Sequence, residues 1–363
     1  MASTVVRLAV GWGCVALFLL AGPAIFAVAG DRWGNLPLFA GLLAVIMWSA
    51  FGVVGEADHL AEMLGEPLGT LVLTLSIVLI EVALIGAVML GGAEPTLGRD
   101  TMFAVLMIVL NGVVGLALLL GGWRYHVQSY NFQGATSFLA VILPLTVVTL
   151  VLPNFTRSTP GGTLSLGQEV AFTVFTLALY GTFLLLQTGR HRDFFIGPED
   201  GEAEEHAHGP TTSRVITVHV ALLIASVLPV VLLAKQLAKV LDKGIHALGA
   251  PPALGGVTIA VIVFTPEAIA ALRAVTLNKL QRTVNLCLGA AASTIGLTVP
   301  VVLALAAATG QNIVLGLDPA EMVLLVLTLV LNLLTFTSQR TTVLLGAMHL
   351  MVFAVYFTLI FNP

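Results

Sequence analysis

The chain is a succession of long apolar runs separated by short polar stretches. A hydrocarbon core about 30 Å thick needs roughly 20 apolar helical residues to cross it. Eleven runs reach this size, so we expect an all-α polytopic membrane protein with about eleven transmembrane helices. The runs lie near residues 8–29, 36–54, 68–90, 101–122, 134–153, 168–188, 215–236, 252–273, 283–308, 319–338 and 342–361.

The first run has an alternative interpretation as a cleaved signal peptide, because Ala27, Val28 and Ala29 resemble a cleavage site. Its apolar length exceeds the roughly 7 to 15 residues of a typical signal sequence. We therefore expect it to be an additional first helix.

Composition strengthens the membrane prediction. Hydrophobic residues make up 58% of the 363-residue chain and charged residues 9%, with a mean hydropathy of +1.03. Soluble domains carry about 25% charged residues, so this much apolar surface must face lipid. A net charge of -4 without a dense basic patch argues against a nucleic-acid partner.

Alternating helices would place nine of the 15 Lys and Arg residues on one side of the membrane. The positive-inside rule then predicts a cytoplasmic N-terminus. The longest polar connection, residues 190–213, would also be cytoplasmic. Residues 199–208 of this connection carry five carboxylates and two histidines. Its composition is typical of a disordered linker, and a cation sensor is the alternative.

The two halves of the chain share a pattern. Leu68 and Gly69 followed by Glu81 recur, 186 residues later, as Leu254 and Gly255 followed by Glu267. Once the first helix is set aside, each glutamate lies in the second of five helices, and a repeat with an odd number of helices must be inverted. We therefore predict an extra helix (1–35), a five-helix repeat (36–189), the acidic loop (190–213) and a second repeat (214–363).

A carboxylate in a spanning helix costs about 2.5 to 3.5 kcal/mol by insertion scales, so two at matched positions indicate a use. One interpretation is that each glutamate is protonated and packs against a neighbouring helix. The other, which we favour, is a midplane cation site formed by Glu81 and Glu267. Because two carboxyls in one dehydrated pocket cannot both ionise easily, protons and a cation would compete for them.

Residues beside the glutamates add oxygen ligands suited to a hard cation. We expect Pro266 to interrupt its helix and free carbonyls near Val263 and Phe264. Thr74 and Thr265 add hydroxyls, although such hydroxyls also bond to their own helix backbone. Before the first matched helix, an acidic segment is either a cation entrance or an exposed interfacial helix. Its carboxylates are Glu56, Asp58, Glu62 and Glu66.

Other polar residues have simpler interpretations. Asp318 and Glu321 flank Pro319, where carboxylates favour the positive end of a helix. His219 and His349 lie in apolar runs and fit hydrogen-bonded core histidines better than metal ligands. We find no pattern of an enzyme nucleophile, phosphate loop or zinc-binding motif.

With these residues in place, the chain resembles the cation/proton exchangers of the calcium/cation antiporter superfamily, particularly the bacterial ChaA-type antiporters. The resemblance implies a bacterial inner-membrane transporter in which Glu81 and Glu267 bind the cation. It also implies that Asn111, Ser293 and Thr294 line the same cavity. The segments that carry it are Gly65–Leu75, Ile80–Val82, Asn111–Gly115, Gly121–Gly122, Pro266–Glu267, Asn278–Lys279, Asn285–Gly289 and Ile295–Thr298.

The sequence thus predicts a secondary transporter rather than an enzyme, with no resident cofactor, that exchanges cytoplasmic Ca²⁺ for H⁺. A Na⁺ or K⁺/H⁺ antiporter that uses the same glutamates is the nearest alternative, and a cation channel is a more distant one. The expected partners are inorganic cations, protons and the lipid bilayer. A homo-oligomer is compatible with the sequence.

Overall fold

The computed structural model describes residues 2–29, 35–64, 68–89, 95–197, 213–251, 253–338 and 341–362. Every regular element in these ranges is a helix. Ten helical stretches among the described residues are long and apolar enough to cross a membrane. Helix α3, Leu68–Met89, adds a stretch of 22 residues whose only charged side chain is Glu81. Each of the eleven predicted runs is therefore helical, as lipid requires of backbone that must bond internally.

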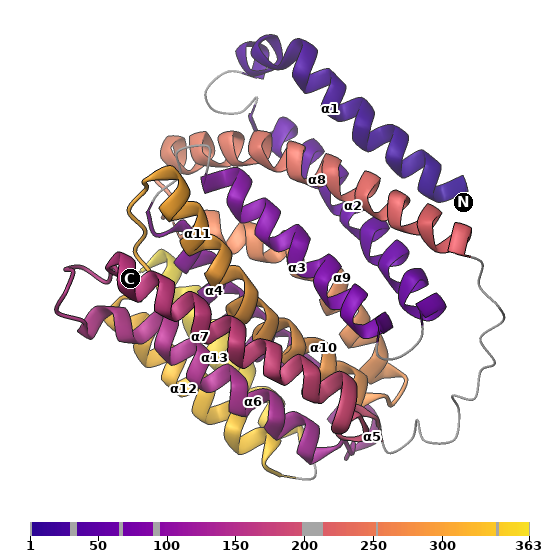
Figure 1. The fold of residues 1–363 in the computed structure, drawn as a ribbon, viewed down its shortest axis with the longest axis vertical. Coiled ribbons are helices and arrows are strands. Elements are labelled where there is room, and N and C mark those ends of the chain that lie inside the picture. Colours follow the sequence, from indigo (N-terminus) through magenta and orange to yellow (C-terminus); the bar gives the residue numbers. More distant parts are fainter. Residues whose placement is uncertain are drawn as a thin grey trace. The chain divides into compact units, whose positions relative to one another are not determined.

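The chain divides into two compact units. The first unit comprises residues 1–97 and 208–263. In it, α2 packs against α1, α3 and α8, and α1 also packs against α8, as Figure 1 shows. Its complete helices are α1 (Ala2–Ala29), α2 (Asn35–Leu64), α3 (Leu68–Met89) and α8 (Ser213–Leu248), joined by the start of α9 (Leu254–Thr276).

The second unit comprises residues 98–207 and 264–363. The helix pairs that pack most extensively in it are α5 with α13, α6 with α10, and α7 with α11. Besides the rest of α9 it contains α4 (Leu97–Met107), η1 (Ile108–Val113), α5 (Val114–Tyr125), α6 (Phe132–Thr146), η2 (Val147–Val151), η3 (Leu152–Phe155), α7 (Leu166–Leu185), η4 (Leu186–Arg190), η5 (Arg192–Phe195), α10 (Leu280–Ser293), η6 (Thr294–Thr298), α11 (Val299–Thr309), α12 (Pro319–Phe336) and α13 (Val343–Phe361).

Each unit draws on both predicted repeats. The first unit contains the opening helices of both, α2 and α8, whereas the second contains the last three helices of both. The repeats are thus interleaved in space, and the repeat boundaries stay a prediction. The five carboxylates and two histidines of residues 199–208 lie outside the described residues.

A π-helical turn interrupts the third helix of each predicted repeat. The turn η1 begins at Ile108 and η6 begins at Thr294, which is the same 186-residue separation as that of the two glutamates. The α-helix resumes immediately after each turn. Because π-turns are rare and are frequent at functional sites, their matched positions support the internal repeat and mark both helices for attention.

Helices α5 and α13 approach each other closely at glycines. A Cβ on Gly346 would lie 2.5 Å from the Leu119 nitrogen and 2.7 Å from the Gly115 carbonyl oxygen. A Cβ on Gly115 would lie 2.9 Å from the Cβ of His349. Small residues allow this contact between membrane helices, where packing rather than hydrophobicity drives association.

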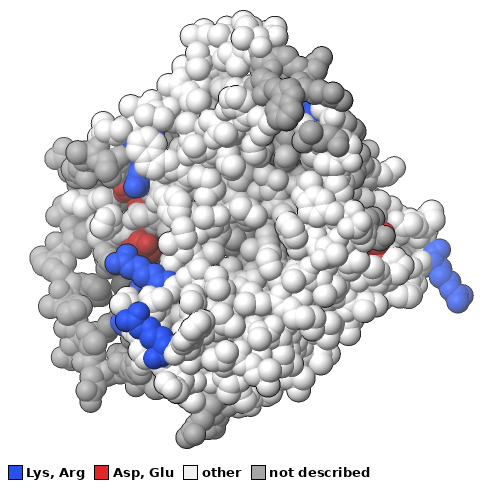
Figure 2. All heavy atoms as spheres, turned by 180° about the vertical axis from the view of Figure 1, so that it is seen from behind, with Lys and Arg blue, Asp and Glu red and all other residues white. Residues whose placement is uncertain are grey.

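The surface and helix ends agree with the sequence pattern. The face shown in Figure 2 is almost entirely uncharged, with a few Lys, Arg, Asp and Glu side chains toward its margins. Helix α12 begins with a capping box in which Asp318 and Glu321 satisfy the first backbone N–H groups, with Pro319 in the first turn. The interpretation of these two carboxylates as helix-end residues is confirmed.

Candidate functional site

The two matched glutamates are both buried. Glu81 of α3 is 1% exposed and Glu267 of α9 is 8% exposed. They belong to different compact units, Glu81 to the first and Glu267 to the second. A carboxyl buried in a spanning helix must be protonated or compensated by a cation or a hydrogen-bond donor. Each position therefore meets the basic requirement of a site that alternates between a proton and a cation.

Glu267 lines a small pocket in the second unit. Its walls come from α9, η1 and α10, and it has space for about one water molecule. The other lining side chains carry no charge, so a cation here would face a single carboxylate on apolar walls. They are Val109, Val113, Phe264, Ala268, Leu286, Cys287 and Ala290.

Helix α9 continues through Pro266, contrary to the expectation of an interruption. The proline lacks an N–H, so the carbonyl four residues earlier, that of Ile262, loses its helical partner. The freed group is thus one residue earlier than the predicted Val263 and Phe264. The helix persists because neighbouring helices and local adjustments tolerate proline in spanning segments. Thr265 is partly buried beside the proline.

Asn111 lies at the centre of the η1 turn and takes part in a buried chain of neutral side chains. Its Nδ2 donates to Thr328 Oγ1 at 2.8 Å, and its Oδ1 lies 3.2 Å from His349 Nδ1. His349 Nε2 lies 3.0 Å from Thr335 Oγ1. All four side chains are 0% exposed. The amide of Asn111 is therefore held by α12 and α13.

The pocket and this polar chain lie on opposite faces of η1. Val109 and Val113 line the pocket with Glu267, whereas Asn111 between them bonds to Thr328 and His349. Residues two positions apart on a helix point in roughly opposite directions. The Asn111 side chain therefore does not enter the Glu267 pocket, although the same η1 turn supplies Asn111 and the two valines of the pocket wall.

The remaining cavity candidates differ in their contacts. Ser293 is buried and its Oγ donates to its own helix, to the Ala290 carbonyl at 3.0 Å. Thr294 is fully buried at the first position of η6. Thr74 lies in α3, seven residues before Glu81, and its side chain is outside the described part of the structure.

In the acidic segment, Glu56 is buried and does not face water as a residue at an open entrance would. Glu56 is 6% exposed, accepts a hydrogen bond from Thr4 Oγ1 at 2.9 Å, and lies 2.9 Å from His219 Nδ1. Asp58 is half-buried. Glu62 lies in α2, with its side chain outside the described part of the structure, and Glu66 is outside the described residues. Glu56 thus ties α2 to α1 and α8 rather than facing water.

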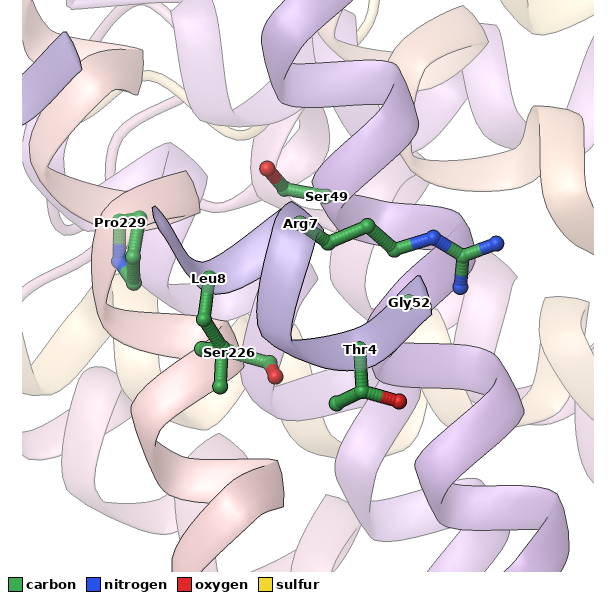
Figure 3. Close-up of a pocket in the computed structure, with 7 residues that line it drawn as sticks. All are labelled: Thr4, Arg7, Leu8, Ser49, Gly52, Ser226 and Pro229. Carbon is green, nitrogen blue, oxygen red and sulfur yellow. The ribbon is translucent and has the colours of Figure 1, made fainter. Parts of the chain in front are cut away.

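A second small pocket lies in the first unit, between α1, α2 and α8 (Figure 3). In Figure 3 the Arg7 guanidinium extends past Gly52, away from the hydroxyls of Ser49 and Ser226. These polar groups do not converge on one point, so the arrangement is typical of a packing gap. Among the described residues no three His, Cys, Asp or Glu side chains gather as metal ligands. A bound cation would therefore need hydroxyl, carbonyl or water ligands beside the glutamates.

Two asparagines of the resemblance hold loops. Asn278 Oδ1 accepts from Gln128 Nε2 at 2.8 Å, and Asn285 Nδ2 donates to the Phe195 carbonyl at 2.7 Å. They brace the connections around α10.

Sequence reasoning missed a row of polar residues on α12 that includes Thr328, the partner of Asn111. Thr328, Asn332 and Thr335 are all fully buried, and Asn332 Nδ2 donates to the Thr328 carbonyl at 2.8 Å. Their spacing of four and then three residues puts them on one face of a helix. That polar stripe within an apolar run was the available signal.

Comparison with known proteins agrees with the fold. The family model described as "Sodium/calcium exchanger protein" matches residues 35–189 and 218–362. The protein y4hA of Sinorhizobium fredii is 43% identical over 351 residues, which cover 96% of this chain and 93% of y4hA. The sodium-potassium/proton antiporter ChaA of Escherichia coli is 38% identical over 349 residues, 93% of this chain and 94% of ChaA.

A solved structure shares the fold. The Ca²⁺/H⁺ antiporter protein YfkE superposes with a TM-score of 0.74 at 17% identity, over the full length of both chains. The resemblance and the all-helical polytopic fold are confirmed, and the two glutamates lie in the matched segments. This chain therefore belongs to the sodium/calcium exchanger family and is a multi-pass membrane protein of the cation antiporter class.

Proposed function

We propose that the protein is a secondary active antiporter that exchanges cytoplasmic Ca²⁺ for H⁺ by alternating access, with Glu81 and Glu267 as the shared cation and proton site. The observation that carries this proposal is the burial of both carboxyls, 1% and 8% exposed, at matched positions of the two predicted repeats. Family membership supports cation exchange in general.

Charge balance explains the coupling. Two carboxylates neutralise one divalent cation, and two protons neutralise the same two carboxylates. An empty, doubly charged site in the low-dielectric barrier is strongly disfavoured, so the protein would reorient only when loaded with either. Exchange then follows without any direct contact between cation and proton.

Monovalent exchange is the second candidate. ChaA, which is named a sodium-potassium/proton antiporter, is 38% identical, whereas the Ca²⁺/H⁺ antiporter YfkE is 17% identical. With Na⁺ or K⁺, one carboxylate would hold the cation while the other stays protonated. A single glutamate substitution would then leave transport partly intact, whereas Ca²⁺ exchange would need both carboxylates.

We place the protein in the bacterial inner membrane with a cytoplasmic N-terminus. The nine-to-six distribution of Lys and Arg over the two sides supports this orientation. Cysteine accessibility at positions 2 and 362 in right-side-out vesicles would test it, since eleven spans put the two ends on opposite sides.

The function is tested by flux in proteoliposomes that contain a pH-sensitive dye. Wild type, Glu81→Gln and Glu267→Gln are compared with Ca²⁺, Na⁺, K⁺ and Mg²⁺ outside. Proton flux driven by Ca²⁺ and abolished in both variants is the expected result. Flux with Na⁺ or K⁺ that survives one substitution would establish the monovalent alternative. Cation currents without proton movement would establish a channel.

A further inference from the structure

The buried chain of Thr335, His349, Asn111 and Thr328 is distinct from the glutamates and has no role in the exchange cycle described above. Every member is 0% exposed, and the chain links three helical segments, η1, α12 and α13. Buried polar networks in a membrane are costly unless satisfied, so a complete one fixes a unique local geometry.

Hydrogen-bond chemistry sets the orientation of the imidazole. Asn111 Oδ1 can only accept, so His349 Nδ1 must carry the proton and donate. Nε2 of the same neutral ring then accepts from the Thr335 hydroxyl at 3.0 Å. The Asn111 amide is fixed in turn, because its NH₂ group is directed at Thr328 Oγ1. Each of these three hydrogen bonds thus has one donor and one acceptor without conflict.

The close packing of α5 and α13 makes this contact possible. Gly115, four residues after Asn111, leaves only 2.9 Å between its would-be Cβ and the Cβ of His349. A larger residue there would push α13 away and lift the imidazole off η1. Gly115 therefore serves the same contact as Asn111.

The η1 turn connects this network to the glutamate pocket. Val109 and Val113 form a wall of the pocket on one face, and Asn111 is anchored on the other. A π-turn carries an extra residue per turn and has poorer intrinsic stability than an α-turn. Its shape thus depends on the anchor, and a shift of the turn would move both valines relative to Glu267.

We propose that His349 is a positioning residue of the cation site, which holds the η1 wall of the Glu267 pocket through its hydrogen bond to Asn111. The proposal rests on the proposed function, since it assigns Glu267 to cation binding. Loss of an outer partner that orients a metal site typically weakens metal affinity by about 10- to 100-fold. We expect an effect of this kind on cation affinity, with a smaller effect on maximal rate.

Two amide substitutions separate the two ring nitrogens. The side-chain nitrogen of His349→Asn occupies about the position of Nδ1 and can still donate to Asn111. The amide of His349→Gln extends to the position of Nε2 and keeps the contact to Thr335 only. Met351→Ala is the matched control, because Met351 lies on the same helix and is exposed. Thermal unfolding of each purified variant checks that it folds.

The experiment measures the half-saturating Ca²⁺ or Na⁺ concentration for proton-coupled flux, with Glu267→Gln assayed in parallel. The proposal predicts a rise of about tenfold or more for His349→Gln and a much smaller rise for His349→Asn. Equal behaviour of the two variants, or a loss of maximal rate at unchanged half-saturation, would overturn it. If Glu267→Gln transports like wild type, the proposed function itself fails, which is a separate result.

Discussion

Each compact unit holds a histidine in an apolar helix, half-buried His219 in the first and fully buried His349 in the second, and the two make different contacts. In the first unit His219 of α8 lies 2.9 Å from the Glu56 carboxylate, which also accepts from Thr4. In the second unit His349 of α13 contacts neutral groups, namely the side chains of Asn111 and Thr335 and the backbone of Leu110. The first pair becomes an ion pair when the imidazole is protonated. The second arrangement is complete only with a neutral ring.

The difference follows from what each histidine joins. Glu56 joins α2 to His219 of α8 and also accepts a hydrogen bond from Thr4 of the additional helix α1. His349 lies beside a turn that lines the pocket of Glu267, where a second charge would compete with the cation. The residue type and the apolar sequence around it therefore do not determine the role of each histidine. The charge of its hydrogen-bond partner, the Glu56 carboxylate or the Asn111 amide, determines it.

The largest predicted effect concerns the close approach of α5 and α13 in the second unit, where the backbones themselves are in contact. In Gly346→Val, the new side chain would collide with the backbone of Leu119 and Gly115, which cannot move aside. Overpacking of this kind costs about 1 to 3 kcal/mol or more. We expect a lower unfolding temperature and poor accumulation in the membrane. Gly181→Ala, where a Cβ meets nothing within 4 Å, is the control and should not lose stability.

Asn111→Asp would make the second unit resemble the first, by placing a carboxylate against His349. A His and carboxylate pair changes charge between about pH 5 and 8, unlike the neutral chain of the wild type. Thermal unfolding should therefore become pH-dependent in this range, with a loss of roughly 1 to 3 kcal/mol from the disrupted bond to Thr328. An unfolding temperature that equals that of the wild type at every pH would show that position 111 does not bond to His349 and Thr328.

Glu56→Gln makes the reverse change and leaves His219 with a neutral partner. The glutamine oxygen can still accept from one of Thr4 and His219, so we expect a loss of only about 1 kcal/mol. Glu56→Ala removes both contacts and should cost more. Chemical unfolding of the two variants measures this order, and a double-mutant cycle with His219→Ala isolates the pair. Equal stability of both variants and wild type would mean that the pair contributes nothing.

The smallest effect is confined to alkaline pH. Tyr130, in the connection between α5 and α6, donates to the carbonyls of Ser338 and Thr335 at the end of α12. Burial raises the pKa of this phenol to about 12, from an ordinary value of about 10. The unfolded chain therefore loses this proton first as the pH rises.

The sign of the pH dependence follows from linkage. The contribution of Tyr130 to stability is fully present below about pH 10 and is lost as the pH rises through about 12. Tyr130→Phe should reduce the alkaline fall in unfolding temperature between these two pH values. An unchanged slope in the variant would indicate that the phenol ionises as readily in the folded protein as in the unfolded chain.

Much of the fold could be predicted because lipid imposes simple rules. Apolar length alone located every spanning run, and the repeat of Leu68, Gly69 and Glu81 pointed to two matched carboxyls that prove to be buried. The interleaving of the repeats into two units could not be predicted, because it depends on helix contacts far apart in sequence.

The local geometry of the site was harder to predict for physical reasons. The π-turns that begin at Ile108 and Thr294 lie within continuous apolar runs, and the hydrophobic pattern does not distinguish them from the α-helix around them. Pro266 was expected to break a helix, but packing holds α9 together through it. The sequence assigns Glu56 to a cation entrance or to an exposed interfacial helix, because its partner His219 lies 163 residues away in sequence.

The central claim is that Glu81 and Glu267 exchange protons for a cation, and cation-induced proton release from the purified protein tests it most directly. Binding to carboxyls that are protonated beforehand must release protons. The account predicts release on addition of Ca²⁺ to wild type and to Met351→Ala, and its loss in both Glu81→Gln and Glu267→Gln. Undiminished release from either glutamine variant would contradict the claim and leave that glutamate a packing residue.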